Sequence, residues 1–165
     1  MGHERSTRRG REGERFASQL EIVEASFRRL MNRPLVRMDE HRSKTRKEAG
    51  VYVIVERDRA MYVGRSRDLR RRLNDHLSSS ISKAALAVRM ARADTRLRAN
   101  YKGERSARHL FDTNETFRAS FNSATERIGA MHVRWVLEED DVRQALLEIY
   151  AAVELETPFN SFRTH

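Results

Sequence analysis

The sequence of 165 residues contains no cysteine, only two prolines and no long run of apolar residues. Without cysteine the chain has no disulfide framework, no thiol nucleophile and no cysteine-ligated zinc site. No stretch approaches the ~18 apolar residues of a membrane-spanning helix, and the first residues lack the apolar core of a signal peptide. We therefore expect one domain of ordinary size that acts in the cytoplasm and makes no membrane contact.

Acidic residues are too few to balance the basic ones. The sequence holds 33 Lys and Arg residues against 24 Asp and Glu residues, which gives a net charge of +9 and a pI near 10.7. A charge this positive makes polyanions the leading class of partner, although charge alone says nothing about fold or chemistry.

The hydrophobic pattern changes several times along the chain and predicts the order of its elements. The expected elements are a disordered tail over 1–12, a helix over 16–30, a polar linker over 35–48, a hairpin of strands over 51–55 and 60–63, a helix capped by Ser66, a helical insertion over 80–129, a strand over 131–137, and a last helix that begins at Asp141 and ends before Pro158. This order predicts an α/β (α+β) fold with a small three-stranded antiparallel sheet flanked by helices. We expect the basic tail and N-terminal helix to occupy residues 1–46 and the main domain residues 47–165.

Glu148 is an unusual residue in its helix because its neighbours in the sequence are almost all apolar. A carboxylate in such surroundings is costly unless it meets a metal ion, an arginine from elsewhere or water. The alternative is that Glu148 lies at the solvated edge of an apolar stripe.

Two further groups of residues have side chains suited to phosphate chemistry. Five arginines and one aspartate lie between Arg65 and Arg72, and His76 shares a helix face with Arg72. This segment is either a solvated basic helix or a phosphate clamp. Tyr52 and Tyr62 lie on adjacent strands and can approach each other, although tyrosines in strands usually serve packing.

Taken together, these residues resemble the GIY-YIG nucleases in order and spacing. The positions that carry the resemblance are the paired motifs Gly50-Val51-Tyr52 and Tyr62-Val63-Gly64 (with Val where the family has Ile), Arg72 eight residues after Gly64, His76 one turn later, and Glu148 followed by Pro158 and Asn160. The resemblance covers residues 49–78 and 131–162. Between Arg72 and Glu148 the chain is about twice as long as in the shortest members, so the resemblance gives the insertion no role.

The resemblance implies a Mg²⁺-dependent endonuclease that acts on DNA, with Mn²⁺ as a possible substitute. It implies that Tyr52 is the general base, that Tyr62 hydrogen-bonds the attacking water or the phosphate, and that Arg72 holds a phosphate oxygen. It also implies that Glu148 binds the metal ion and that His76 accepts a proton or grips phosphate. We expect Arg72 and the cation to lower the pKa of Tyr52.

The remaining expectations concern supporting residues and DNA contacts. Gly64 and Asn160 are expected to support the site, and Asn160 to fix the Glu148 helix against the hairpin. The residues expected to contact DNA are Arg65, Arg70, Arg71, Arg89, Arg92, Arg96 and Lys102, because basic residues cluster there with few acids. The acidic corner over 138–141 is expected to face away from DNA.

Two other functions stay open at this point. The same scaffold can serve as a nucleic-acid-binding module that does not cut, since fold does not dictate function. The chain can also be an RNA-directed nuclease, although no RNA-binding motif with stacking aromatics is evident. Whether the chain is a monomer or a homodimer is undecided.

Overall fold

The computed structural model describes residues 13–97 and 106–162. Its elements are α2 (Glu14–Met31), β1 (Val36–Arg37), the 3₁₀ helix η1 (Met38–Ser43), β2 (Gly50–Glu56), β3 (Arg59–Ser66), α3 (Leu69–His76), α4 (Ala85–Thr95), α5 (Ala107–Thr113), α6 (Glu115–Ala130), β4 (His132–Leu137) and α7 (Asp141–Glu154). The expected disordered tail, residues 1–12, lies outside the described residues. None of the described helices combines the length and apolarity that a membrane span requires.

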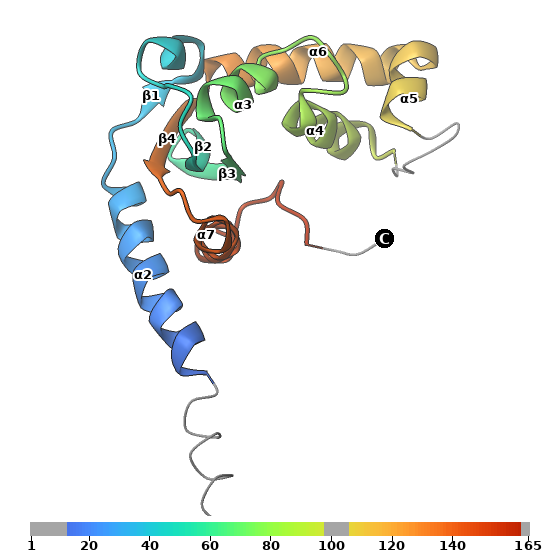
Figure 1. The fold of residues 1–165 in the computed structure, drawn as a ribbon. Coiled ribbons are helices and arrows are strands. Elements are labelled where there is room, and N and C mark those ends of the chain that lie inside the picture. Colours follow the sequence, from blue (N-terminus) through green and yellow to red (C-terminus); the bar gives the residue numbers. More distant parts are fainter. Residues whose placement is uncertain (1–12, 98–105, 163–165) are drawn as a thin grey trace, which may run out of the picture.

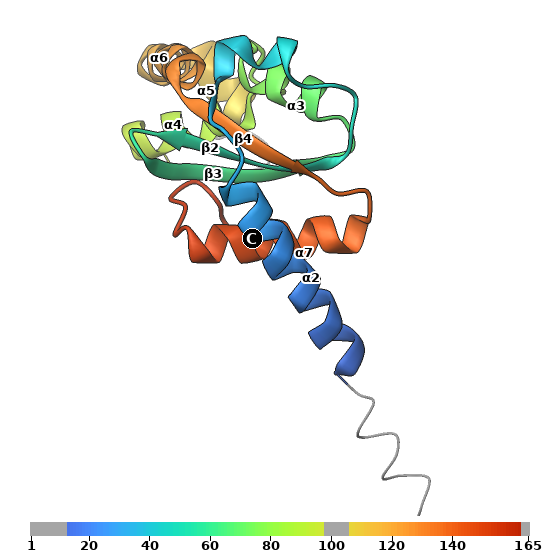
Figure 2. The ribbon, with the colours of Figure 1, turned by 90° about the vertical axis from the view of Figure 1, so that its left-hand side faces the viewer.

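The four strands form one antiparallel sheet in the order β1-β4-β2-β3 (Figures 1 and 2). The α/β class is therefore confirmed, but the predicted number of three strands is wrong. The missed strand, β1, pairs Val36 with Val133 and Arg37 with His132. Two residues are too few to show the alternation of a strand, which is why 35–48 was expected to be a linker.

The predicted hairpin is confirmed. β2 pairs with β3 on one side and with β4 on the other, and its residues from Gly50 to Val55 are all buried. A strand covered on both faces gives the continuous apolar run that the sequence shows. The turn consists of Arg57 and Asp58, whose φ angles of 47° and 65° are those of a tight hairpin turn.

Helices cover both faces of the sheet (Figure 2). α2 and α7 cover one face, where Val63 packs with Leu147 and Ala151. The ring of Phe27 from α2 meets that of Tyr150 from α7 edge to face, with centroids 5.3 Å apart. α2 therefore packs against α7 as well as against the sheet.

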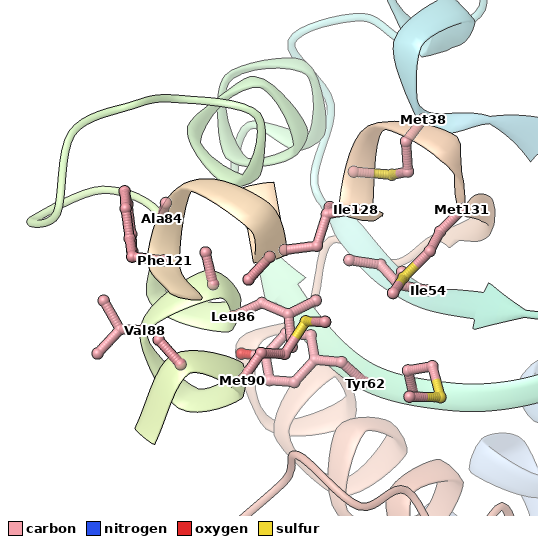
Figure 3. Packing of buried hydrophobic residues seen from close by; sticks show 14 of the residues in the cluster. Met38, Ile54, Tyr62, Ala84, Leu86, Val88, Met90, Phe121, Ile128 and Met131 are labelled. Carbon is pink, nitrogen blue, oxygen red and sulfur yellow. The ribbon is translucent and has the colours of Figure 1, made fainter. Parts of the chain in front are cut away.

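The helical insertion covers the other face. α4 and α6 bury Leu86, Met90 and Phe121 in a core that also contains Ile54 and Tyr62 of the sheet (Figure 3). The insertion is thus part of the main hydrophobic core and helps to hold the ring of Tyr62.

The cap of α3 differs from the prediction. Asp68 rather than Ser66 caps α3, and its side chain accepts a hydrogen bond from the amide of Arg71. The last helix, α7, begins at Asp141 as predicted, and Asp140 caps it by accepting from the amide of Arg143. The carboxylate of Asp141 is therefore not used as the cap, and it pairs with Arg67 instead.

Candidate active site

A hollow of about 460 Å³ lies at the outer edge of the sheet, beside β3. We call it the β3 hollow, and its lining residues are Tyr62, Arg65, Ser66, Arg67, Arg72, Asp141, Gln144 and Glu148. Tyr62 belongs to the core on the α4 side of the sheet, whereas Glu148 belongs to α7 on the opposite side. Because β3 is an edge strand, side chains from both faces meet around it.

Tyr52 is not among the residues that line the hollow. It is fully buried, and it pairs with Gly64 in the register of β2 and β3. A Cβ atom added at Gly64 would lie 2.3 Å from the Tyr52 hydroxyl oxygen, so only glycine leaves room for the ring. The rings of Tyr52 and Tyr62 have centroids 6.3 Å apart.

His76 forms a buried hydrogen bond with Tyr52. Its Nε2 lies 2.7 Å from the Tyr52 hydroxyl oxygen, and its ring meets the rings of both Tyr52 and Tyr62 edge to face. Burial, reinforced by the charge of Arg72, lowers the pKa of His76 to about 3. The imidazole is therefore neutral at neutral pH, and it is fully covered.

The pKa of Tyr52 moves in the direction opposite to our expectation. Burial raises it above the ordinary value for a phenol, and the neighbouring Tyr62 raises it further. Arg72 lowers it, as expected, but by less than burial raises it. In the protein alone, Tyr52 is a phenol and not a phenolate.

The carboxylate of Glu148 is paired with an arginine from another part of the chain, Arg65. The Nε atom of Arg65 donates to Glu148 Oε2 at 3.0 Å, and 23% of the glutamate side chain is exposed. The second ion pair at the hollow joins Arg67 to Asp141. Asp141 belongs to the acidic corner that was expected to face away from DNA, and it lines the same hollow as Glu148.

The donor set of the hollow fits a hydrated Mg²⁺ ion. In the part of the chain that the structure describes, no group of three or more His, Cys, Asp or Glu side chains is placed to hold a metal. Glu148 is half-buried at the hollow, and Gln144 beside it uses its amide nitrogen on the carbonyl of Glu138, at 2.7 Å. Its amide oxygen remains available as a further ligand. Mg²⁺ is commonly held by one or two protein oxygens and keeps several waters.

Two arginines lie close to Tyr62. Arg72 is half-buried, lines the hollow and makes a long hydrogen bond of 3.5 Å to the carbonyl of Lys83. Arg89 of α4 donates to the carbonyl of Phe159 at 2.5 Å, and its guanidinium carbon lies 5.4 Å from the centroid of the Tyr62 ring. Arg89 thus holds Tyr62, a role that its place in a basic cluster did not suggest.

Asn160 holds the outer edge of β3. Its side-chain amide accepts from the Val63 amide and donates to the Val63 carbonyl, both at 2.8 Å. Thr157 donates to the same oxygen of Asn160 at 2.9 Å. The segment after α7 therefore pairs with β3 between Tyr62 and Gly64.

The other residues expected to contact DNA lie in different surroundings. Arg70 donates to the carbonyls of Thr45 and Arg42, at 2.7 and 3.2 Å. Arg71 is exposed on α3, Arg92 is half-buried on α4, and Arg96 is exposed at the end of α4. Lys102 lies outside the described residues.

One comparison with known proteins gives a match. A family model described as the GIY-YIG catalytic domain matches residues 48–121. No curated protein and no solved structure matches the chain. The matched segment includes Tyr52, Tyr62, Arg72 and His76, and it ends before Glu148. The fold brings Glu148 to the same hollow as Tyr62 and Arg72 of the matched segment.

Proposed function

Because the chain belongs to the GIY-YIG nuclease superfamily, we propose that it is a Mg²⁺-dependent endonuclease that hydrolyses phosphodiester bonds of DNA in the β3 hollow. The observation that carries the proposal is that Tyr62, Arg72 and Glu148, from three separate elements, line that one hollow. A phenol, a guanidinium and a carboxylate supply the hydrogen bonding, phosphate binding and metal binding that the reaction needs.

The phosphate group would be held by the arginines of the hollow. Apart from its contacts with the two phenols, Arg72 makes one long hydrogen bond to a backbone carbonyl, so its guanidinium can turn towards a phosphate oxygen. Arg65 now donates to Glu148. When Glu148 binds the metal ion, Arg65 would leave it and bind the substrate backbone instead. A Mg²⁺ ion bound by Glu148, with Gln144 beside it, would neutralise charge on the departing 3′-oxygen.

Tyr52 would act as the general base with His76 as its partner. As the O–H bond of the attacking water breaks, its proton would pass to the Tyr52 oxygen, while the original Tyr52 proton would pass to His76 Nε2, 2.7 Å away. Because His76 is neutral, the lone pair of its Nε2 is available to the Tyr52 hydroxyl, but the low pKa makes the imidazole a weak base, so this transfer needs the negative charge of the bound phosphate nearby. The complete burial of His76 argues against the other role, a grip on phosphate. Arg72, which lies against both phenols, would have to turn towards the phosphate for water to reach Tyr52.

The test is cleavage of supercoiled plasmid DNA in Mg²⁺ by the parent, Glu148→Gln and Arg72→Ala proteins. We expect each variant to cut about 100-fold more slowly or worse, the usual loss when a group that stabilises transition-state charge is removed. The matched controls are Glu154→Gln, on an exposed turn of the same helix, and Arg59→Ala, an exposed cation outside the hollow. Both controls should cut at the parent's rate.

Three results would contradict the proposal in different ways. Cleavage at the full rate by both Glu148→Gln and Arg72→Ala would remove the β3 hollow as the active site. Tight DNA binding with no nicking in Mg²⁺ or Mn²⁺ would make the chain a binding module. Faster cleavage of structured RNA than of duplex DNA would make it an RNA-directed nuclease.

A further inference from the structure

Two hollows meet at the chain's single tryptophan, on the opposite edge of the sheet from the β3 hollow. The first, of about 510 Å³, runs along the end of α2 and the second half of β4, and the second, of about 350 Å³, lies between β1 and the end of η1. Both are lined by Trp135 and Arg33. We call this pair the Trp135 hollows.

Trp135 is held by the core while part of its surface stays open. It pairs with Tyr52 in the register of β4 and β2, and it packs against the core cluster on that face. Its side chain is only half-buried, because β1 pairs with β4 no further than Val133. The backbone of β4 beyond Val133 therefore forms an open edge beside the indole.

The charge that the described residues place around Trp135 is positive. Among them, Arg29, Arg33 and Lys44 line the two hollows, and no Asp or Glu does. All three cations are exposed. In contrast, the β3 hollow contains Asp141 and Glu148. The Trp135 hollows are thus the ones suited to a ligand that brings its own negative charge.

Contacts within the protein hold the elements that line the Trp135 hollows. Arg134, whose side chain points to the other face of the sheet, donates to the carbonyl of Met31 and so ties the end of α2 to β4. The Nη2 atom of Arg29 is fixed by Ser26 at 2.8 Å. The end of α2, which carries Arg29 and leads to Arg33, is therefore fixed beside β4 and the indole.

We propose that the Trp135 hollows bind single-stranded nucleic acid, with a base stacked on Trp135 and phosphates held by Arg29, Arg33 and Lys44. An aromatic ring between cations is the common means of holding a single strand, because every base has a flat face and every linkage a charge. A duplex hides its base faces within the stack and offers only phosphates. The site makes no use of Mg²⁺ or Glu148, so it does not depend on the proposed cleavage.

The test uses the fluorescence of Trp135, which the absence of any other tryptophan makes a specific probe. A short oligothymidylate is titrated into the parent protein in EDTA, where no cutting can occur. We expect saturable quenching that weakens as salt rises. Polyglutamate, which has the charge without bases, and a duplex of the same length should leave most of the indole fluorescence in place.

The variants are measured by the anisotropy of an end-labelled oligothymidylate. Trp135→Leu should bind about fivefold more weakly or worse, the range found when a stacking ring is removed. The double variant Arg33→Ala/Lys44→Ala keeps the core intact and should lower both the affinity and the salt dependence, by about 0.7 in logarithmic slope for each lost phosphate contact. Arg59→Ala removes an exposed cation elsewhere and should bind as the parent does.

Any of three results would overturn the proposal. The indole fluorescence could stay unchanged at saturating oligothymidylate, or duplex or polyglutamate could quench it equally. The Arg33→Ala/Lys44→Ala protein could bind oligothymidylate as tightly as the parent, which decides the matter even if Trp135→Leu fails to fold.

Discussion

Arg65 and Glu148 stand 83 positions apart in the sequence and are joined by a hydrogen bond of 3.0 Å between Arg65 Nε and Glu148 Oε2. The pair links β3 to α7 at the point where the sheet edge meets the β3 hollow. Because it uses one oxygen of the carboxylate proposed to bind Mg²⁺, the guanidinium and the metal ion must compete for Glu148. On the proposed function, Arg65 would neutralise the carboxylate until Glu148 binds the metal ion and Arg65 binds a phosphate.

Removal of Arg65 should strengthen metal binding and weaken DNA binding. The ion pair is partly exposed, and such pairs contribute at most about 1 kcal/mol. We therefore expect Arg65→Ala to bind Mn²⁺ about fivefold more tightly by isothermal titration calorimetry, without DNA. Its affinity for DNA should fall, since a phosphate contact is lost.

The controls for this prediction separate the ion pair from general charge. Arg59→Ala removes the same charge far from the hollow and should leave the Mn²⁺ affinity unchanged. Glu148→Gln should abolish the Mn²⁺ site. An Arg65→Ala protein that binds Mn²⁺ no more tightly than the parent would show that Glu148 is not the ligand, or that Arg65 does not restrict it.

Replacement of Gly64 by alanine should destabilise the protein and impair the site. The new Cβ atom would lie 2.3 Å from the hydroxyl oxygen of Tyr52, whose ring is fully buried and has no free space to enter. Overpacking of this kind costs about 1–3 kcal/mol in the free energy of unfolding, which urea denaturation measures. Cleavage should fall as well, because the Tyr52 hydroxyl would be pushed from His76.

Gly129 on α6 provides the matched control for Gly64. A Cβ atom added there meets nothing nearer than Leu77, at 4.0 Å. Alanine favours a helix more than glycine does, so Gly129→Ala should leave the stability unchanged or raise it by up to about 1 kcal/mol. If both alanine variants had the parent's stability, the close approach of Tyr52 to Gly64 would not constrain the sheet.

The sequence allowed the hairpin to be predicted because strand composition and the spacing of Tyr52 and Tyr62 are local properties. The partner of Glu148 could not be predicted, since Arg65 is one of several arginines in its segment and only the fold selects it. The pKa of Tyr52 was expected to fall because the neighbouring charge of Arg72 could be foreseen. Burial raises this pKa instead. The extent of burial depends on how α4 and α6 cover the sheet, so no short segment of the sequence predicts it.

The buried His76 should make the stability depend on pH. Its pKa is about 3 in the folded protein, against 6.5 for an ordinary histidine, so between these values the unfolded chain binds a proton that the folded protein does not. Stability from this group is complete above pH 6.5 and is lost as the pH falls. Between pH 6.5 and about 5 the loss amounts to ~2 kcal/mol.

The comparison for this prediction is His76→Phe, which keeps a ring in the core and does not titrate. Urea unfolding of both proteins across the same pH range should show a smaller loss in the variant by ~2 kcal/mol, although the variant is less stable throughout for want of the Tyr52 hydrogen bond. Equal slopes in the two proteins would mean that His76 takes up its proton in the folded state as well.

Asn160 should hold β3 in place as a neighbouring strand would. Its side chain makes two hydrogen bonds to Val63, both of 2.8 Å, at the outer edge of the sheet. Asn160→Ala leaves both backbone groups of Val63 without these partners, at a cost of about 1–3 kcal/mol. Hydrogen exchange should show the Val63 amide losing protection, and because Tyr62 and Gly64 flank Val63, cleavage should slow at temperatures where the protein is still folded.

Two variants make this prediction specific to the contact with Val63. Asn122→Ala removes an exposed asparagine from α6 and should change the stability by no more than about 0.5 kcal/mol. Asn160→Asp keeps an acceptor for the Val63 amide but puts a carboxylate oxygen opposite the Val63 carbonyl, so protection of that amide should survive while stability falls. If the Val63 amide in Asn160→Ala exchanged as slowly as in the parent, the contacts of β3 with β2 and with Phe159 would suffice to hold it, and Asn160 would have no part in fixing Tyr62 at the hollow.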